Sequence, residues 1–407
     1  MMHIAPFNIA RLPRILFGEG GTKEIPAQVA TFGKRVLIIT GAQSFRATAH
    51  WQTLQQGLRE QGLTWETFTV QGEPSPDLVD QAVKDYRNSG IEVVLGIGGG
   101  SVLDAAKAIA GLLPHGNSVM DHLDGVGKGI AYQGPSTPFI AVPTTAGTGS
   151  EATKNAVLSR QSAETGFKKS FRHEYLVPQV AIVDPALLAS CPPDLLAANG
   201  MDAFTQLLEP YVSSNANPLT DALAISGMTA FRDGFFAAIE AKDEAAAKAG
   251  RSQLAYASLL SGITLAQAGL GSVHGLASPL GAFFPCPHGV VCGTLVAEAT
   301  DINITALSER TPDSIALRKY ANVGALLVNH PLPLSSFQVE LLAAFCTILV
   351  DTLRNWTKRL ALPKLSAYGM QAADIDKVVA NCRGGSMKTN PIVLTDAELR
   401  ELLQRRL

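Results

Sequence analysis

The feature that most restricts the fold is an apolar run that ends in three consecutive glycines. Residues 93–97 predict a short buried strand, and the turn after it contains Gly98, Gly99 and Gly100, which have no Cβ. Ser101 follows at a position where it can cap a helix over residues 102–113. A strand that enters a helix through such a turn is typical of a parallel sheet, and the helix N-terminus offers N–H groups to a phosphate.

Strand and helix patterns alternate through the first half of the chain. Strands are predicted at residues 35–40, 65–70, 92–97, 139–142 and 180–183, and further helices at 47–61 and 77–89. This alternation predicts a mostly parallel sheet with helices on both faces.

After Asp184-Pro185 only helices are predicted. Their ranges are 194–212, 218–241, 244–268, 289–307, 314–328, 336–360, 373–382 and 396–406. We therefore expect an α/β dinucleotide-binding (Rossmann-like) domain over residues 1–188, followed by an all-α domain over residues 189–407. Because no flexible joint separates them, we expect the active site in the cleft between the two domains.

Charge and cysteine content limit the classes of partner. The 33 basic and 35 acidic residues leave a net charge of −2, so no field attracts nucleic acid. The five cysteines are odd in number and show no C-x-x-C spacing, which favours reduced thiols in a cytoplasmic protein. The N-terminus lacks the pattern of a signal peptide.

A long stretch without charge raises the membrane question. Residues 252–297 contain no Asp, Glu, Lys or Arg, but glycines and prolines interrupt the run before it reaches the length of a membrane-spanning helix. We interpret it as the buried centre of a protein that does not cross a membrane.

A second segment, at residues 142–151, combines four hydroxyl side chains with two glycines. Its sequence PTTAGTGSE and the earlier GGGSxxDxAK resemble the two cofactor signatures of the iron-containing (group III) alcohol dehydrogenase family. The resemblance implies a nicotinamide cofactor. The implied cofactor residues are Gly98, Gly99, Gly100, Ser101, Asp104, Thr144, Thr145, Thr148 and Ser150. A glycine turn at the end of a strand also forms without any ligand.

The same resemblance implies a divalent metal site on the helical half. Asp202, His274 and His288 match three metal-binding positions of the family. Iron is the metal that the family implies, and one carboxylate with two imidazoles also suits Zn²⁺ or Mn²⁺. Taken singly, each histidine is also compatible with a hydrogen-bonded place in the core.

Two positions depart from the family pattern. The fourth metal ligand is a histidine in the family, but position 206 is Gln, a neutral and weaker ligand. Ser278 stands where the family commonly has a histidine that moves protons, and a hydroxyl can pass a proton without storing one. Gln206 is therefore a doubtful ligand, and Ser278 is a candidate proton relay.

The choice of nicotinamide cofactor depends on the end of the strand at residues 35–40. NAD-preferring relatives place an Asp where this chain has Gly41, and an acid there would repel the 2′-phosphate of NADP. Ser44 and Arg46 supply donors nearby, so we expect NADP(H), with NAD(H) as the alternative, although Arg46 is also compatible with an exposed charge.

Lys168 has two interpretations. It matches a lysine that reaches the cofactor in the family, or it is a solvated lysine of a polar loop.

The resemblance covers the whole chain and predicts a metal-dependent NAD(P)H alcohol dehydrogenase or aldehyde reductase that acts on small alcohols or aldehydes. We expect a homodimer. One alternative is a maleylacetate reductase, against which Asp202 counts. A dehydroquinate synthase type of lyase would need a site for a phosphorylated, polyhydroxylated substrate, which the charge-free cleft residues disfavour. The remaining alternative is a nucleotide-binding protein whose metal site has degraded.

Overall fold

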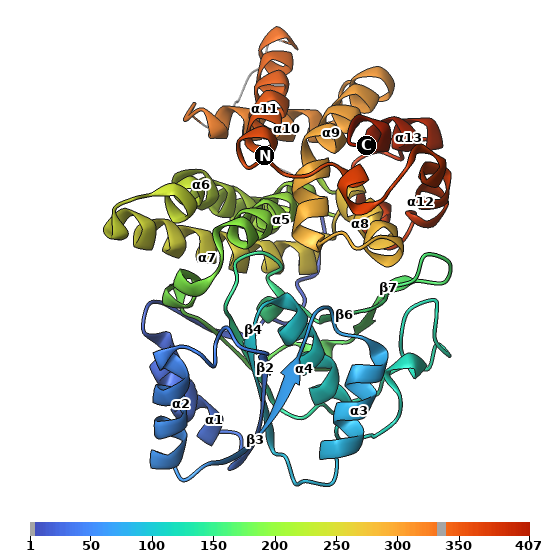
Figure 1. Cartoon of the computed structure of the whole chain (residues 1–407). Coiled ribbons are helices and arrows are strands. Elements are labelled where there is room, and N and C mark those ends of the chain that lie inside the picture. The colour runs from blue at the N-terminus through green and yellow to red at the C-terminus, as the bar shows by residue number, and fades with distance from the viewer. Residues whose placement is uncertain (1–4, 332–338) are drawn as a thin grey trace.

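The helical second half of the chain stacks on the edge of the sheet at which the parallel strands end (Figure 1). The computed structural model describes residues 5–331 and 339–407. The strands are β1 (Arg14–Phe17), β2 (Arg35–Gly41), β3 (Thr64–Val70), β4 (Val93–Gly98), β5 (Phe139–Pro143), β6 (Asn155–Arg160), β7 (Phe167–Arg172) and β8 (Val180–Val183). A parallel sheet followed by helices confirms the predicted fold class.

The helices divide into those that cover the sheet and those that form the second half. The first group is α1 (Ile25–Ala30), α2 (Ala49–Glu60), α3 (Pro76–Tyr86) and α4 (Gly100–Leu112). The second group is α5 (Pro193–Val212), α6 (Pro218–Glu240), α7 (Glu244–Ala268), α8 (Ser272–Phe283), α9 (His288–Arg310), α10 (Ile315–Leu327), α11 (Val339–Arg359), α12 (Ile375–Asn381) and α13 (Asp396–Arg405). The first residues of the helix predicted at 336–360 lie outside the described residues. The predicted domain boundary near residue 188 falls between β8 and α5 and stays a prediction.

The main sheet has six parallel strands in the order β1-β8-β5-β4-β2-β3. From β2 the chain moves outward to β3 and then crosses back to β4 on the other side of β2, where Thr40 pairs with Ile97. This reversal is a topological switch point, where a crevice opens between the ends of adjacent strands. The segments that follow β2 and β4 are those predicted to bind the cofactor.

Both faces of the four inner strands, β2, β4, β5 and β8, are buried, as expected for parallel strands, whereas the edge strands β1 and β3 are more exposed. Along β2, Leu37 and Ile39 pack into the apolar cluster shared with α3 and α4. Val36 and Ile38 point the other way, into the cluster shared with α1 and α2. All four side chains are fully buried, because successive residues of a strand alternate between the faces.

Three strands and two helices were not predicted from the sequence. They are β1, β6, β7, α1 and α8. β6 and β7 form a separate antiparallel pair, so Lys168 lies in a strand, and its predicted place in a polar loop is wrong. α8 contains Pro279 and leaves α7 at an angle of 100° after Gly269, which has a φ of 76°.

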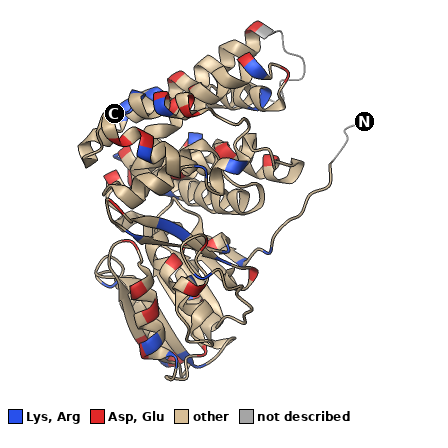
Figure 2. Ribbon diagram, turned by 90° about the vertical axis from the view of Figure 1, so that its right-hand side faces the viewer, with Lys and Arg blue, Asp and Glu red and all other residues tan. Residues whose placement is uncertain are grey.

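The segment before β1 runs away from the rest of the molecule when seen from the side (Figure 2). It carries Phe7, Ile9 and Leu12, which are exposed apolar side chains. β1, to which it leads, is an edge strand of the main sheet.

Two helices, α6 and α9, are long and apolar enough to span a membrane when judged by length and composition alone. In the apolar window of α9, 78% of the residues are buried inside the protein, compared with 39% in α6. That the chain does not cross a membrane stays a prediction.

A buried lysine ties the α/β part together. Lys107 of α4 is fully buried and donates hydrogen bonds to Ser150 O (2.9 Å), Ser150 Oγ (3.0 Å), Thr153 Oγ1 (2.9 Å) and Asn155 O (2.6 Å). The Asp104 carboxylate lies 3.8 Å from its Nζ. Burial lowers the pKa of Lys107 to about 8. One side chain therefore fixes the loop after β5 to helix α4.

We predict that Lys107→Met lowers the free energy of unfolding by about 3 kcal/mol, because Asp104 and several acceptors lose their buried partner. Chemical denaturation measures the change. Lys154→Met is the matched control, since Lys154 forms a more exposed ion pair with Glu174 whose loss costs less than about 1 kcal/mol. Equal losses in the two variants would contradict this role of Lys107.

Candidate active site and metal centre

The two predicted cofactor segments lie against each other at the switch point. The backbone N–H of Thr144 donates to Gly98 O at 3.0 Å. A Cβ on Gly99 would come within 3.2 Å of Thr145 Oγ1, and a Cβ on Gly100 within 2.7 Å of Thr148 Cγ2. The packing of these segments therefore leaves little room for a side chain at Gly99 and less at Gly100, whether or not a ligand is bound.

No side chain caps the N-terminus of α4, so the prediction that Ser101 caps this helix is wrong. Gly99 takes the N-cap position, and Ser101 is the second residue of the helix. Because glycine offers no side-chain acceptor, N–H groups of the first turn remain available to an anionic ligand.

Asp104 and Ser150 form hydrogen bonds within the protein. Ser150 Oγ donates to Asp104 Oδ1 at 2.5 Å, and the N–H of Val157 donates to Asp104 Oδ2 at 3.1 Å. With Lys107, these residues position the loop around the cofactor segments. That they also contact the cofactor stays a prediction.

A cavity of 380 Å³ is lined by the segments that follow β2 and β5. Three predicted cofactor residues, Ser44, Thr144 and Thr145, line it together with apolar side chains such as Phe45 and Leu187. An apolar cavity with a few hydroxyl groups in its lining suits a ring that carries a few polar atoms.

The end of β2 has room for a side chain. A Cβ on Gly41 would lie 3.9 Å from Ser44 Oγ and 3.9 Å from Val102 Cγ2, which is ordinary van der Waals contact. Arg46 Nε donates to Thr40 Oγ1 at 2.8 Å, while its buried Nη2 has no hydrogen-bond partner within the described part of the chain. One guanidinium nitrogen at the end of β2 is therefore unpaired.

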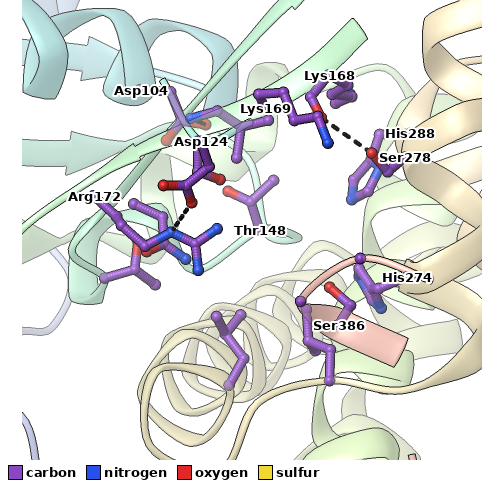
Figure 3. Close-up of a pocket in the computed structure, with 18 of the residues that line it drawn as sticks. Asp104, Asp124, Thr148, Lys168, Lys169, Arg172, His274, Ser278, His288 and Ser386 are labelled. Carbon is purple, nitrogen blue, oxygen red and sulfur yellow. Dashed lines mark hydrogen bonds and ion pairs between the residues drawn. The ribbon is translucent and has the colours of Figure 1, made fainter. Parts of the chain in front are cut away.

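A larger cavity, of 670 Å³, lies between the α/β part and the helices (Figure 3). Its α/β wall includes the predicted cofactor residues Gly100, Ser101, Asp104, Thr148, Ser150 and Lys168. Its helical wall includes Gln206, His274, Ser278 and His288. The structure thus brings parts of both cofactor segments and two of the predicted metal ligands, His274 and His288, to one chamber.

Lys168 and Ser278 meet at one side of this chamber. Lys168 Nζ lies 2.6 Å from Glu73 Oε1, and its side chain is 11% exposed. Ser278 Oγ donates to the backbone oxygen of Lys168 at 3.0 Å. Lys168 is therefore not a solvated surface lysine.

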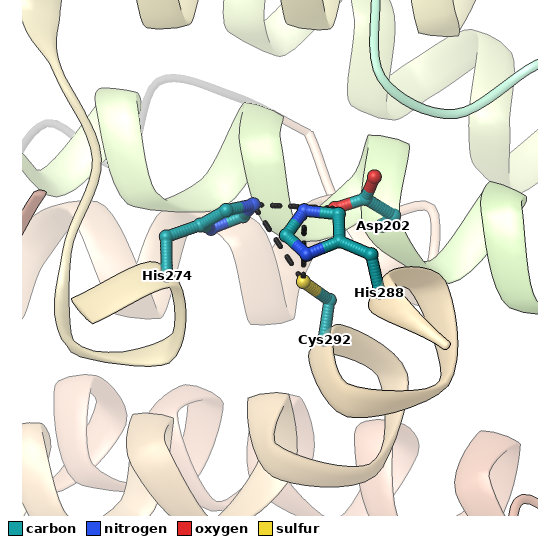
Figure 4. A group of neighbouring side chains, drawn as sticks. All are labelled: Asp202, His274, His288 and Cys292. Carbon is teal, nitrogen blue, oxygen red and sulfur yellow. Dashed lines mark hydrogen bonds and ion pairs between the residues drawn. The ribbon is translucent and has the colours of Figure 1, made fainter. Parts of the chain in front are cut away.

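The predicted metal ligands converge from three helices (Figure 4). Asp202 comes from the middle of α5, His274 from the first turn of α8, and His288 from the first residue of α9. Asp202 Oδ1 lies 3.2 Å from His274 Nε2 and 3.8 Å from His288 Nε2. Ligand atoms at such distances can all contact one ion.

A carboxylate behind His274 fixes the orientation of that ring. Glu209 Oε2 lies 2.6 Å from His274 Nδ1, and Glu209 Oε1 accepts the backbone N–H of Val273 at 2.7 Å. When Nδ1–H donates to Glu209, Nε2 is directed toward Asp202. Metal-binding histidines usually have such a carboxylate partner, so this contact distinguishes a ligand from an ordinary core histidine.

Burial and neighbouring charges together set the protonation of Asp202, His274 and His288. Burial lowers the pKa of His288 to about 4, which leaves its ring neutral at pH 7. Burial opposes ionisation of Asp202, but His288 and His274 hold its pKa below the ordinary value. Burial also opposes a charge on His274, yet the adjacent Glu209 carboxylate and the contact with Asp202 raise the pKa of that ring. A metal ion that binds between these side chains would displace a proton shared among them.

Cys292, which was not predicted as a site residue, lies beside both histidines. Its Sγ lies 3.6 Å from His274 Nε2 and 3.8 Å from His288 Nε2. Burial raises the pKa of this thiol to about 12 when no metal is bound. The spacing of four residues between His288 and Cys292 on one helix was the only signal in the sequence.

Gln206 lies one turn from Asp202 on α5, as predicted. Its Nε2 donates to Gly147 O at 3.4 Å, and its buried Oε1 has no partner among the residues described. The amide therefore lines the larger cavity with one free acceptor.

Two family models match the chain, namely "Iron-containing alcohol dehydrogenase" over residues 13–185 and "Fe-containing alcohol dehydrogenase family, C-terminal" over residues 196–407. The chain belongs to the iron-containing alcohol dehydrogenase family. The resemblance inferred from the two signatures is confirmed. As a member of this family, the protein is an oxidoreductase that acts on CH–OH groups with a nicotinamide cofactor and a divalent metal.

Relatives align with this iron-containing alcohol dehydrogenase along nearly its full length. It is 31% identical to long-chain-alcohol dehydrogenase 1 of Geobacillus thermodenitrificans, with 98% of this chain and 96% of the relative covered. It is 29% identical to the NAD-dependent methanol dehydrogenase of Bacillus methanolicus, covering 97% and 98%. The structure of the alcohol dehydrogenase ADH/D1 from an archaeal source in a Red Sea brine pool has a TM-score of 0.88 at 25% identity, with 100% of both chains covered.

We predict that Glu209→Gln weakens binding of Zn²⁺ to the metal-depleted protein by about 10- to 100-fold, because a neutral amide holds the ring of His274 less firmly. Calorimetric titration measures the affinity. Glu240→Gln, which changes an exposed carboxylate on α6, is the control and should bind as the wild type does. An unchanged affinity in Glu209→Gln would show that this carboxylate does not support a metal ligand.

Proposed function

We propose that this enzyme transfers a hydride between NADP(H) and a small alcohol or aldehyde held at a divalent metal ion. One observation carries the proposal: the larger cavity is lined both by the cofactor segments and by His274 and His288. A nicotinamide held by the first and a substrate held by the second would be neighbours in one chamber.

Asp202, His274 and His288 would hold the metal ion, which acts as a Lewis acid on the substrate oxygen when it is bound. Their donor set of one carboxylate and two imidazoles, with Glu209 behind His274, fits Fe²⁺ as the family implies, and also Zn²⁺ or Mn²⁺. Three of the four metal-binding positions of the family, Asp202, His274 and His288, keep a strong ligand, which argues against a degraded site.

Other residues would position the reactants. The glycine turn and the hydroxyls of the second segment would hold the cofactor, with Lys168 reaching toward it from β7. Ser278 lines the chamber and has a hydroxyl that can pass the substrate proton onward. The stretch without charged residues from 252 to 297 supplies much of the helical wall and limits access of water.

The preference for NADP(H) rests on the end of β2. No carboxylate stands at Gly41, and Arg46, whose Nη2 is unpaired among the described residues, donates a hydrogen bond to Thr40 near the end of the same strand. A guanidinium is a favourable partner for a 2′-phosphate, whereas an acid at position 41 would repel it.

The substrate class follows the relatives, which are named for methanol and for long-chain alcohols. We also propose that the enzyme is a cytoplasmic homodimer. The exposed apolar side chains of the segment before β1, together with the free edge of that strand, supply a surface that a second copy can cover.

We predict that the purified protein, supplied with Fe²⁺, Zn²⁺ or Mn²⁺, reduces short-chain aldehydes with NADPH. His288→Ala should lose this turnover because a metal ligand is gone, while NADPH binding followed by fluorescence persists. His330→Ala, which changes an exposed histidine, is the control. Absence of turnover across a broad panel of alcohols and aldehydes with every metal would reject the proposed function.

We predict that Gly41→Asp weakens NADPH binding by about 30-fold, or about 2 kcal/mol, because two negative charges would approach each other at the ribose. The available space at position 41 accepts the side chain. Gly41→Asn has nearly the same shape without the charge and should weaken NADPH binding far less. A wild-type enzyme that binds NADH more tightly than NADPH would contradict the assignment.

A further inference from the structure

Cys292 lies with the three predicted metal ligands in a single group. One ligand atom from each of Asp202, His274, His288 and Cys292 lies within 4.8 Å of all the others (Figure 4). The Cys292 side chain is fully buried, so its thiol faces these groups and not solvent. None of the other four cysteines belongs to this group.

The distances within the group are close to those of a four-coordinate ion. Zinc lies about 2.0–2.2 Å from nitrogen or oxygen and about 2.3 Å from sulfur, so tetrahedral ligands stand about 3.3–3.6 Å apart. Asp202 Oδ1 to His274 Nε2 is 3.2 Å, and Cys292 Sγ to His274 Nε2 is 3.6 Å. Both Asp202 Oδ1 and Cys292 Sγ lie 3.8 Å from His288 Nε2.

We propose that Cys292 Sγ is the fourth protein ligand of the metal, in the role that the family gives to a histidine at position 206. The proposal rests on the metal site of the proposed function. Binding replaces the proton of the Cys292 thiol by the metal ion and releases that proton to solvent. The ligand set is then one carboxylate, two imidazoles and one thiolate.

Gln206 is the weaker candidate for this position. Its amide is neutral, and a thiolate binds first-row metals such as Zn²⁺ far more strongly than an amide oxygen does. Its Nε2 is already engaged with Gly147 O. Gln206 lines the chamber, and its buried Oε1 has no hydrogen-bond partner among the described residues.

A thiolate changes the charge and the metal preference of the site. With Asp202 and Cys292 both ionised, a divalent ion is fully neutralised by its protein ligands, whereas a site with one carboxylate and three imidazoles keeps one positive charge. Soft sulfur ligands favour Zn²⁺ and disfavour the hard cations Mg²⁺ and Mn²⁺. We therefore expect the protein to select Zn²⁺ over Mn²⁺.

Cobalt(II) reports directly on a sulfur ligand, since a Co²⁺–thiolate bond produces an intense charge-transfer absorption that nitrogen and oxygen ligands do not. The full-length protein is depleted of metal with a chelator and titrated with Co²⁺. We expect this absorption in the wild type and in Cys346→Ser, which changes a buried cysteine outside the cluster. Cys292→Ser should lose it and bind Zn²⁺ about 100-fold more weakly.

A second pair of measurements covers the case in which Cys292→Ser fails to fold. In the wild type, Zn²⁺ should protect one cysteine from alkylation under mildly denaturing conditions, and peptide mass spectrometry should identify it as Cys292. In Cys292→Asn with Gln206→His, metal affinity should return without the charge-transfer absorption, because an imidazole replaces the thiolate.

The outcomes separate this inference from the proposed function. Co²⁺ that binds and supports turnover without the sulfur absorption would overturn the role of Cys292 and leave the enzyme assignment intact. The sulfur absorption without turnover would uphold Cys292 and reject the proposed activity. Absence of any metal binding would reject both, and an absorption that survives in Cys292→Ser would overturn the inference.

Discussion

The chemistry of the helical part depends on how two carboxylates of α5 are buried in it. Asp202 is 1% exposed and Glu209 is 7% exposed, and burying an unpaired charge costs several kcal/mol. Glu209 is satisfied only because the first turn of α8 presents a backbone N–H and the ring of His274 to it. Asp202 in turn faces two imidazoles. The N-terminal ends of α8 and α9 therefore supply the partners of both buried carboxylates of α5.

The contact between α8 and Glu209 of α5 also explains why two glycines stand between α7 and α8. Gly269 has a positive φ, which allows the sharp bend that brings α8 against α5. A Cβ on Gly271 would meet Glu209 Oε1 and Asn390 Oδ1, each at 2.9 Å. The glycines that interrupt the charge-free stretch thus permit the close approach of a carboxylate to a helix N-terminus.

Sequence reasoning succeeded where a pattern is local. The helix at residues 244–268 matches α7 at both ends, because Asp243 caps its start and Gly269 ends it. It failed at α8, whose glycines and Pro279 resemble a loop, and at β6 and β7, where charged residues hide the alternation. Asp202, His274 and His288 were found through family motifs. Cys292 was not, because a buried cysteine in a helix resembles a small apolar residue until the fold brings other ligands beside it.

His288 and Cys292 lie one turn apart on the same face of α9, whereas position 206 belongs to α5. A histidine at 206 and a cysteine at 292 would approach the same ion from different helices, so one chain can carry both. An ancestor with both side chains would keep four ligands after either one was lost. Exchange of a ligand between helices can therefore proceed by single substitutions, with a loaded metal site at every step.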